Sequence, residues 1–301
     1  MTPFFTHPFP KSAYFRLFEY QKNMKLPSFQ PDYPLVFFIL FSRVAAGLSL
    51  VSVFFTPSAV RTGFALFFMG LATIASIAHL SAPLRFLTMV RNNKSFLVWE
   101  VRLAGALTAF LGLQFLSFFG YFERLDTLFP WINFVLAIFF LIMTGWAYRF
   151  ETHPAWKTSI LPVYYIASAI MIGLVLRAMY YPMTPLPFLY ILLLITEAFL
   201  LFLYRNHLQK TSPSALEGMV TGPEKRLLLA FLWTTLLLPA LLTMILIFKG
   251  YHHGTANILM AVSCGTGIFI ERILFFQVER PVYFLSFIEN PSGKDRFWVR
   301  G

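Results

Sequence analysis

The chain has 301 residues, of which 58% are hydrophobic and 12% are charged, and its formal net charge is +11. Soluble domains carry about 25% charged residues, and a soluble fold has no way to bury this much apolar surface, which includes 37 phenylalanines. The composition therefore predicts an integral membrane protein. The basic residues lie between apolar stretches, where they set membrane orientation, so we do not expect nucleic-acid binding.

Residues 1–32 form an N-terminal arm that precedes the first apolar stretch. The arm is basic but has no apolar core of signal-peptide length, so we do not predict a cleavable signal. Its run from 14 to 25, YFRLFEYQKNMK, has amphipathic character. We expect this run to lie on the membrane surface or on a partner protein.

Eight apolar stretches follow the arm, and each is long enough for a transmembrane helix, which needs about 20 residues. The predicted spans are 33–55, 62–83, 98–120, 128–148, 159–181, 186–204, 227–248 and 254–276. Pro162 and Pro239 fall inside spans and are predicted to kink them. No strand alternation is sustained enough for a membrane barrel. The predicted fold is an all-α bundle of eight transmembrane helices over residues 33–276, followed by a C-terminal tail, 277–301.

The distribution of lysine and arginine predicts the orientation of the bundle. Eight spans place both termini on one side, together with the loops after spans 2, 4 and 6. These segments hold 17 of the 24 basic residues, whereas the opposite loops hold 3. The positive-inside rule puts this basic side, and both termini, in the cytoplasm of a prokaryotic inner membrane. A basic docking surface for a hydrophilic partner is the alternative cause of the asymmetry.

Several charged residues fall inside the spans, where they are costly and usually functional. Most lie in the half nearer the basic side, and Arg43 lies deepest, near mid-membrane. In a purely structural role, acids and arginines on different helices neutralise one another. Alternatively, they line a functional cavity. The charges concerned are Arg43, Arg102, Arg177, Glu197, Glu271 and Arg272.

The segment 77–104 places a histidine and a carboxylate at neighbouring helix ends on the basic side. His79 closes span 2, and Glu100 opens span 3. A histidine titrates near neutral pH, and a partly buried carboxylate can do so as well. Either group can therefore take a proton from a quinol hydroxyl. In the structural alternative, His79 caps its helix and Glu100 pairs with Arg102 or Arg85.

The placement of histidine and cysteine argues against a redox centre in this chain. A membrane b-type haem needs two facing histidines, and only His79 among the six lies in or at the end of a span as an inner ligand. The single cysteine, Cys264, cannot hold an iron–sulfur cluster, which normally needs about four thiolates. We interpret Cys264 as a small buried residue. No zinc motif or phosphate-binding glycine loop is present, so we predict no metal site.

Four segments occur in a recognisable order: AHLSAPLR at the end of span 2, SFLVWEVRLAGAL at the start of span 3, YRFETHPAWKTSILP before span 5 and ERILFF in span 8. Together they resemble the membrane anchor subunit of the dimethyl sulfoxide reductase family. Ser81 stands where that family usually has glycine, and Trp99 where it has arginine, whereas Glu100 is retained. The similarity covers about residues 33–280, and the arm is an addition to the family pattern.

The resemblance implies an anchor for a molybdopterin (molybdenum-cofactor) catalytic subunit and a ferredoxin-like iron–sulfur subunit. It implies oxidation of menaquinol, as in anaerobic respiration, with no haem and no iron–sulfur cluster in this chain. It also implies a role in that oxidation for two residues, His79 and Glu100, which are the predicted catalytic residues. The predicted quinol-binding set adds nearby span charges, and consists of His79, Glu100, Arg43, Arg102, Glu271 and Arg272. Related anchors serve sulfoxide, thiosulfate, tetrathionate or sulfite enzymes, and some reduce quinone.

Two alternatives to the quinol-oxidising anchor remain open from the sequence. A secondary transporter would line its pathway with Arg–Glu pairs and would show inverted repeats with broken helices. No convincing repeat relates residues 33–150 to 159–276. A structural tether without quinol chemistry is the second alternative.

Overall fold

The computed structural model describes residues 32–79, 95–148, 154–179, 186–222, 224–249 and 254–278. Contacts within the chain divide it into two compact units, Met1–Pro31 and Asp32–Gly301. Nearly all of the predicted arm and tail lies outside the described residues. The fold described below belongs to the second unit.

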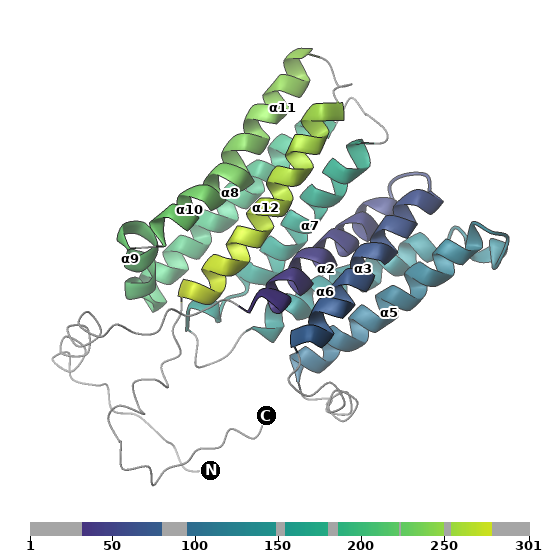
Figure 1. Cartoon of the computed structure of the whole chain (residues 1–301), viewed down its shortest axis with the longest axis horizontal. Coiled ribbons are helices and arrows are strands. Elements are labelled where there is room, and N and C mark those ends of the chain that lie inside the picture. Colours follow the sequence, from purple (N-terminus) through teal and green to yellow (C-terminus); the bar gives the residue numbers. More distant parts are fainter. Residues whose placement is uncertain are drawn as a thin grey trace, which may run out of the picture. The chain divides into compact units, whose positions relative to one another are not determined.

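Eight helical spans in the described part are long and apolar enough to cross a membrane, and no strand occurs there (Figure 1). This confirms the predicted all-α membrane bundle. The spans are α2 (Tyr33–Ser52), α3 (Ala59–His79), α5 (Phe96–Ser117), α6 (Phe129–Ala147), α7 (Ile160–Ala178), α8 (Leu186–Thr211), a composite of α10 (Lys225–Leu232), the π-helix η4 (Trp233–Leu237) and α11 (Leu238–Lys249), and α12 (Gly254–Val278).

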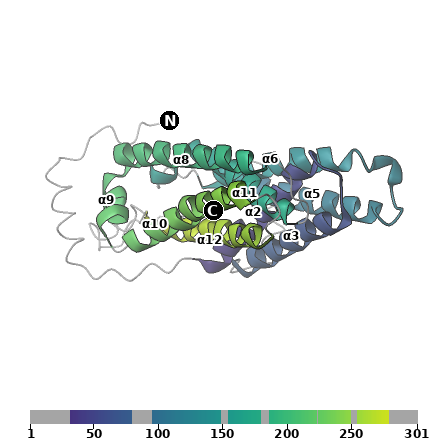
Figure 2. The same cartoon turned by 90° about the horizontal axis from the view of Figure 1, so that it is seen from above.

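Three short helices connect these spans in the described loops, namely η2 (Glu123–Leu125), η3 (Pro154–Trp156) and α9 (Pro213–Thr221). α8 continues to Thr211 instead of ending at residue 204, and α9 occupies what was predicted as loop. Figure 2 shows α9 at the ends of α8 and α10. Hydropathy detects only the apolar part of a helix that spans the bilayer. The polar end of α8 and the short α9 were therefore missed.

The two prolines predicted to kink helices have different surroundings. Pro239 is the second residue of α11, which directly follows the π-helix η4. Proline lacks an N–H and disrupts the regular α-helical bonding of the preceding turn, which accounts for a π-type turn at this point. Pro162 lies in the first turn of α7, where a proline removes no intrahelical hydrogen bond. The predicted kink at Pro162 therefore has no basis in the structure.

The spans form two groups of four consecutive helices. In the first half, α2 packs against α3 and α6, and α5 packs against α6 and α3. In the second half, α7 packs against α8 and α12, and α11 packs against α8 and α12. The halves meet mainly through α2 and α7. Each half contains four spans, so the chain enters the second half from the same side of the membrane as the first. Both halves therefore run in the same direction. They are not the inverted repeats that the transporter alternative predicted.

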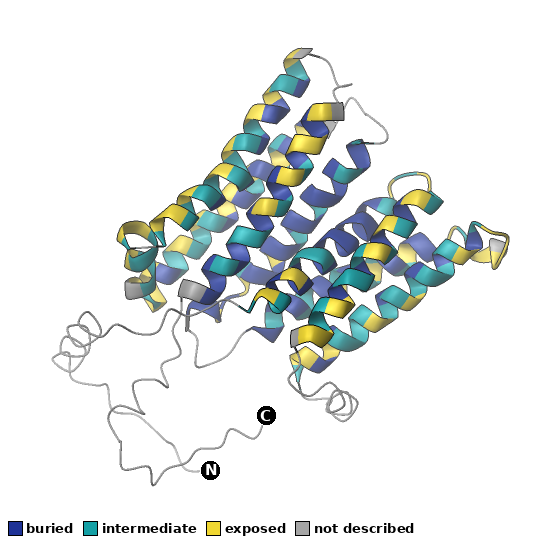
Figure 3. Cartoon of the chain, in the orientation of Figure 1, coloured by how far each residue is buried: buried dark blue, intermediate teal, exposed yellow. Residues whose placement is uncertain are grey.

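The contact between α2 and α7 depends on small residues. A Cβ atom built on Gly47 would collide with the backbone of Ala169, and one built on Gly173 would collide with the backbone of Gly47. Small residues let helix backbones approach closely in membranes, where packing drives association. α2 and α7 are accordingly the most buried spans, and both are mainly dark blue in Figure 3.

The outward faces of the helices carry large apolar side chains, as a protein in contact with lipid requires. Exposed examples occur on both halves of the bundle: Phe67, Phe139, Leu192, Phe199 and Leu241. The charged residues inside the spans behave differently, since most of them are buried among helices.

Candidate functional site

Two arginines and one glutamate pair where the two halves meet. Arg43, in the middle of α2, donates from Nη1 to Glu271 Oε2 over 3.0 Å and to Ser168 Oγ over 3.2 Å. Arg272 directly follows Glu271 in α12, and its Nη2 lies 3.4 Å from Glu271 Oε1. Arg43 and Arg272 are only 1% and 0% exposed. We call Arg43, Glu271 and Arg272 the buried triad. With all three ionised, it carries one net positive charge.

Aromatic rings surround the two guanidinium groups. The Cζ atoms of Arg43 and Arg272 lie 4.3 Å and 4.2 Å from the centroid of the Tyr165 ring. Arg272 also lies 4.5 Å from the ring of Phe275 and 5.6 Å from that of Tyr148. A cation over an aromatic face gains about 2 kcal/mol or more when it is desolvated. Tyr165 therefore helps to hold two like charges close together.

Two further buried acids lie within electrostatic reach of the buried triad. Glu100 of α5 is 1% exposed and interacts with Arg272. Glu197 of α8 is also buried, and it interacts with Arg43 and Glu271. Helices from both halves therefore contribute charges to one network of α2, α5, α8 and α12.

Glu100 is unusual among these acids because, among the described residues, only the Thr144 hydroxyl lies beside its carboxylate as a potential hydrogen-bond donor. Both of its oxygens are buried, and neither has a partner among the described residues. The hydroxyl of Thr144 lies beside it, but donates to the Phe140 carbonyl over 3.0 Å. Buried polar groups normally have partners, and an unsatisfied one calls for an explanation such as a catalytic role or a bound molecule.

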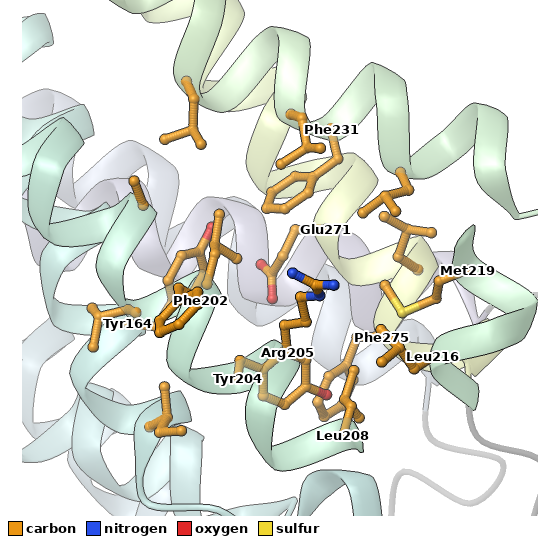
Figure 4. Close-up of a pocket in the computed structure, with 18 of the residues that line it drawn as sticks. Tyr164, Phe202, Tyr204, Arg205, Leu208, Leu216, Met219, Phe231, Glu271 and Phe275 are labelled. Carbon is orange, nitrogen blue, oxygen red and sulfur yellow. The ribbon is translucent and has the colours of Figure 1, made fainter. Parts of the chain in front are cut away.

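Glu271 also lines a cavity of about 480 Å³ in the second half (Figure 4). The walls come from α7, α8, α9, α10, η4 and α12, and most of them are apolar. Polar groups come from Glu271, Arg205, Tyr164 and Tyr204, and Figure 4 shows Arg205 and Glu271 directed into the cavity. Cavities of about 300–1,000 Å³ with a few polar groups are typical of small-molecule sites.

A family model described as DMSO reductase anchor subunit (DmsC) matches residues 28–278. The chain belongs to this family. The match includes all eight spans, the buried triad and the cavity, and it confirms the resemblance drawn from four short segments. No curated protein matches the chain. The protein is thus a multi-pass membrane subunit of the DMSO reductase anchor type.

The structure brings together four of the six predicted site residues of this DmsC-family chain: Arg43, Glu100, Glu271 and Arg272. His79 is the last residue of α3, and its side chain lies outside the described residues, as does Arg85. The catalytic roles of His79 and Glu100 stay predictions.

Arg102 is not one of the buried charges of the DmsC-family chain. Its Cζ is 5.1 Å from the ring of Trp99, which is itself exposed. Residues two positions apart on a helix do not face each other, so Arg102 and the buried Glu100 project from different sides of α5. The helix geometry therefore does not favour an ion pair between Arg102 and Glu100. Cys264 is buried in α12, in agreement with its interpretation as a packing residue.

Apart from Glu271, sequence reasoning missed the polar residues of the cavity, because Arg205 was assigned to a loop and the tyrosines carried no signal. One pattern could have shown that the loop is structured. Ser212 and Pro213 form a helix start, and Leu216, Met219 and Val220 then recur at helical spacing. These are the start signals and periodicity of an amphipathic helix.

Proposed function

We propose that this DmsC-family subunit oxidises quinol in the cytoplasmic membrane for the reductase that it anchors. Membership of an anchor-subunit family supports the anchoring role. The observation that carries the quinol role is the buried carboxylate of Glu100, to which the described residues offer no donor besides the Thr144 hydroxyl, itself bonded to the Phe140 carbonyl. A quinol hydroxyl, or a water that relays its proton, supplies the missing donor.

Quinol oxidation breaks two O–H bonds and releases two protons and two electrons. Glu100 and His79 accept the protons, for which a base within about 2.6–3.2 Å, or one water away, is required. Arg272 places a positive charge near Glu100. This charge stabilises the ionised Glu100 carboxylate, which would be costly alone in a bilayer. The two electrons pass to an iron–sulfur cluster of a ferredoxin-like partner, and then to a molybdenum-cofactor catalytic subunit.

The quinol that we propose is menaquinol, and the partners bind on the basic side of the membrane, which faces the cytoplasm. That side carries the 17 basic residues, and the charged network lies in the half of the bundle nearer to it. The two halves run in the same direction, so the described spans are not an inverted repeat of the kind found in many secondary transporters.

The experiment replaces the two proposed proton acceptors in the assembled complex. We expect Glu100→Gln and His79→Ala each to lower quinol-dependent turnover by about 10²–10⁴-fold, the usual contribution of general acid–base catalysis. Turnover with an artificial electron donor to the soluble subunits should survive, because that donor bypasses the anchor.

Thr108→Ala on α5 is the control, because Thr108 only donates to the Ala104 carbonyl of its own helix. It should leave both activities unchanged. Wild-type quinol oxidation by assembled Glu100→Gln and His79→Ala complexes would show that neither residue accepts the protons.

A further inference from the structure

The cavity beside Glu271 combines a mainly apolar wall with a surplus of positive charge. Leucine and phenylalanine make up most of the wall, and its charged members are Arg205 and Glu271. The charge of Glu271 is matched within the protein, because Arg43 and Arg272 both lie beside its carboxylate. The wall therefore holds no acid that is left over to compensate Arg205. This combination suits an amphipathic ligand with an anionic head.

Arg205 is available to bind such a head. Among the described residues, it takes part in no hydrogen bond, ion pair or ring contact. Its guanidinium group is nevertheless directed into the cavity, as Figure 4 shows. A guanidinium group can bind a phosphate through two parallel hydrogen bonds, which are stronger than hydrogen bonds between neutral groups. Arg205 thus offers an anion a charged donor pair at the cavity wall.

Arg205 also lies at the depth of the lipid head groups. It is the first charged residue after the apolar run 198–204 of α8, and a polar run, RNHLQKT, then ends the helix. Between 205 and 226 the chain has four basic residues and two acids. A basic site between transmembrane helices, at the side predicted to face the cytoplasm, favours an anionic phospholipid.

The position of the cavity gives access from the bilayer. α8 packs on α7 and α11, whereas α10 packs on α12 and α9, and the cavity lies between α8 and α10. α9 closes one end with Leu216, Met219 and Val220. Two lining residues also face outward, since Phe202 is 53% exposed and Val220 47% exposed. An acyl chain can enter the cavity past these side chains from the lipid.

We propose that this cavity binds one anionic phospholipid from the leaflet on the basic side of the membrane. The phosphate accepts hydrogen bonds from Arg205, and one acyl chain lies among the apolar side chains between α8 and α10. The bound lipid joins two helices that pack mainly on other partners. The site is separate from Glu100, which is not part of the cavity wall, and the inference does not depend on quinol oxidation.

The first test removes the proposed phosphate ligand. The assembled complex is transferred into detergent with equal amounts of phosphatidylglycerol, which is anionic, and phosphatidylethanolamine, which is zwitterionic. Native mass spectrometry then measures which lipid each complex retains, and the intact mass confirms assembly. Arg205→Gln is compared with Arg226→Gln, which removes the same charge from an exposed position of α10 outside the cavity wall.

The second test fills the cavity without changing any charge. Leu201→Trp on α8 enlarges a lining side chain. Leu192→Trp makes the same change on the same helix at a position that is 60% exposed and does not line the cavity. A phosphatidylglycerol with a photoreactive group in its acyl chain reports where the lipid lies.

We expect the wild type and both control variants to retain phosphatidylglycerol in preference to phosphatidylethanolamine. Arg205→Gln should lower retention of phosphatidylglycerol by about 5-fold or more, the loss expected for one basic residue beside an anionic lipid. Leu201→Trp should lower it as well, because the acyl chain loses its space. The photoreactive lipid should label α8, α9, α10 or α12 in the wild type, and label much less in Leu201→Trp.

Four results would overturn the inference. Unchanged retention in both Arg205→Gln and Leu201→Trp would place the lipid elsewhere. Equal retention of the two phospholipids would show that the cavity does not recognise an anionic head. Displacement by excess inorganic phosphate would identify a site for a free anion, and displacement by a menaquinone analogue would assign the cavity to quinone. The proposed function is tested separately, by the quinol-dependent turnover of Glu100→Gln.

Discussion

Arg43 lies in the middle of a membrane-spanning helix, yet every described group that stabilises its charge comes from another helix. Glu271 on α12 supplies a carboxylate, and Ser168 and Tyr165 on α7 supply a hydroxyl and an aromatic face. Removing one partner of a buried ion pair is strongly destabilising, because the remaining charge is left uncompensated. The single acid of the buried triad serves two arginines, so its loss has the larger consequence.

We therefore expect Glu271→Gln to destabilise the protein more than Arg43→Gln. Glu271→Gln leaves two guanidinium groups beside one tyrosine ring without their shared counter-charge, at a cost of about 3–5 kcal/mol. Arg43→Gln leaves the neutral pair of Glu271 and Arg272. The midpoint of thermal denaturation of the purified complex measures the difference. Equal midpoints for the two variants would show that the acid does not hold both arginines.

Residue identity alone revealed part of this site. Arg43, Glu271 and Arg272 stand out in the sequence because a charge inside an apolar run is visible without a structure. Their pairing was not visible, since it depends on which helices become neighbours. Arg102 is equally conspicuous in the sequence, but it projects from a different side of α5 and stacks on Trp99.

At the scale of elements, the spans themselves were predictable because about 20 apolar residues have no other stable environment. The cavity was not, because leucine and phenylalanine in its wall look the same as those that face lipid. Its end is closed by α9, which is too short and too polar to register as a span. The π-type turn before Pro239 was predicted only as a kink.

The crossing of α2 and α7 gives a prediction at this scale. Gly47→Ala and Gly173→Ala should each destabilise the bundle by about 1–3 kcal/mol, the usual cost of overpacking, because the new Cβ atoms meet opposing backbone atoms. Gly70→Ala and Gly112→Ala are matched controls, since no atom lies within 4 Å of a Cβ at either position.

Thermal denaturation of the four glycine variants in the same detergent provides the measurement. The control variants should retain the wild-type midpoint, while the two crossing variants should melt lower. If all four variants behaved alike, close approach of α2 and α7 would not be what joins the halves.

For the whole molecule, the asymmetry of basic residues is the property with the clearest consequence. The 17 basic residues of one side against 3 on the other exceed what random placement gives, and lysine and arginine are retained on the cytoplasmic side during insertion. The number of spans in the described part of the chain is even, so we expect the two termini to share the basic side.

We expect reporters fused to either terminus to be active in the cytoplasm. A fluorescent protein that matures only in the cytoplasm should report both ends, and alkaline phosphatase, which requires the periplasm, should be inactive at both. A phosphatase placed in the loop after α2 is the positive control. Active phosphatase at a terminus would mean that the loops are basic because a partner docks there on the periplasmic side.

The ion pair between Arg43 and Glu271 joins residues that are 228 positions apart in the sequence, and this separation has a consequence for biosynthesis. A ribosome adds about 5–20 residues per second, so roughly 10–50 seconds pass between synthesis of the two partners. Throughout that interval the guanidinium of Arg43 lacks the carboxylate to which it is bonded in the folded protein. Glu197, which also interacts with Arg43, is made earlier with α8, but the ion pair itself forms only once α12 has been synthesised, and a polypeptide that stops before α12 lacks it.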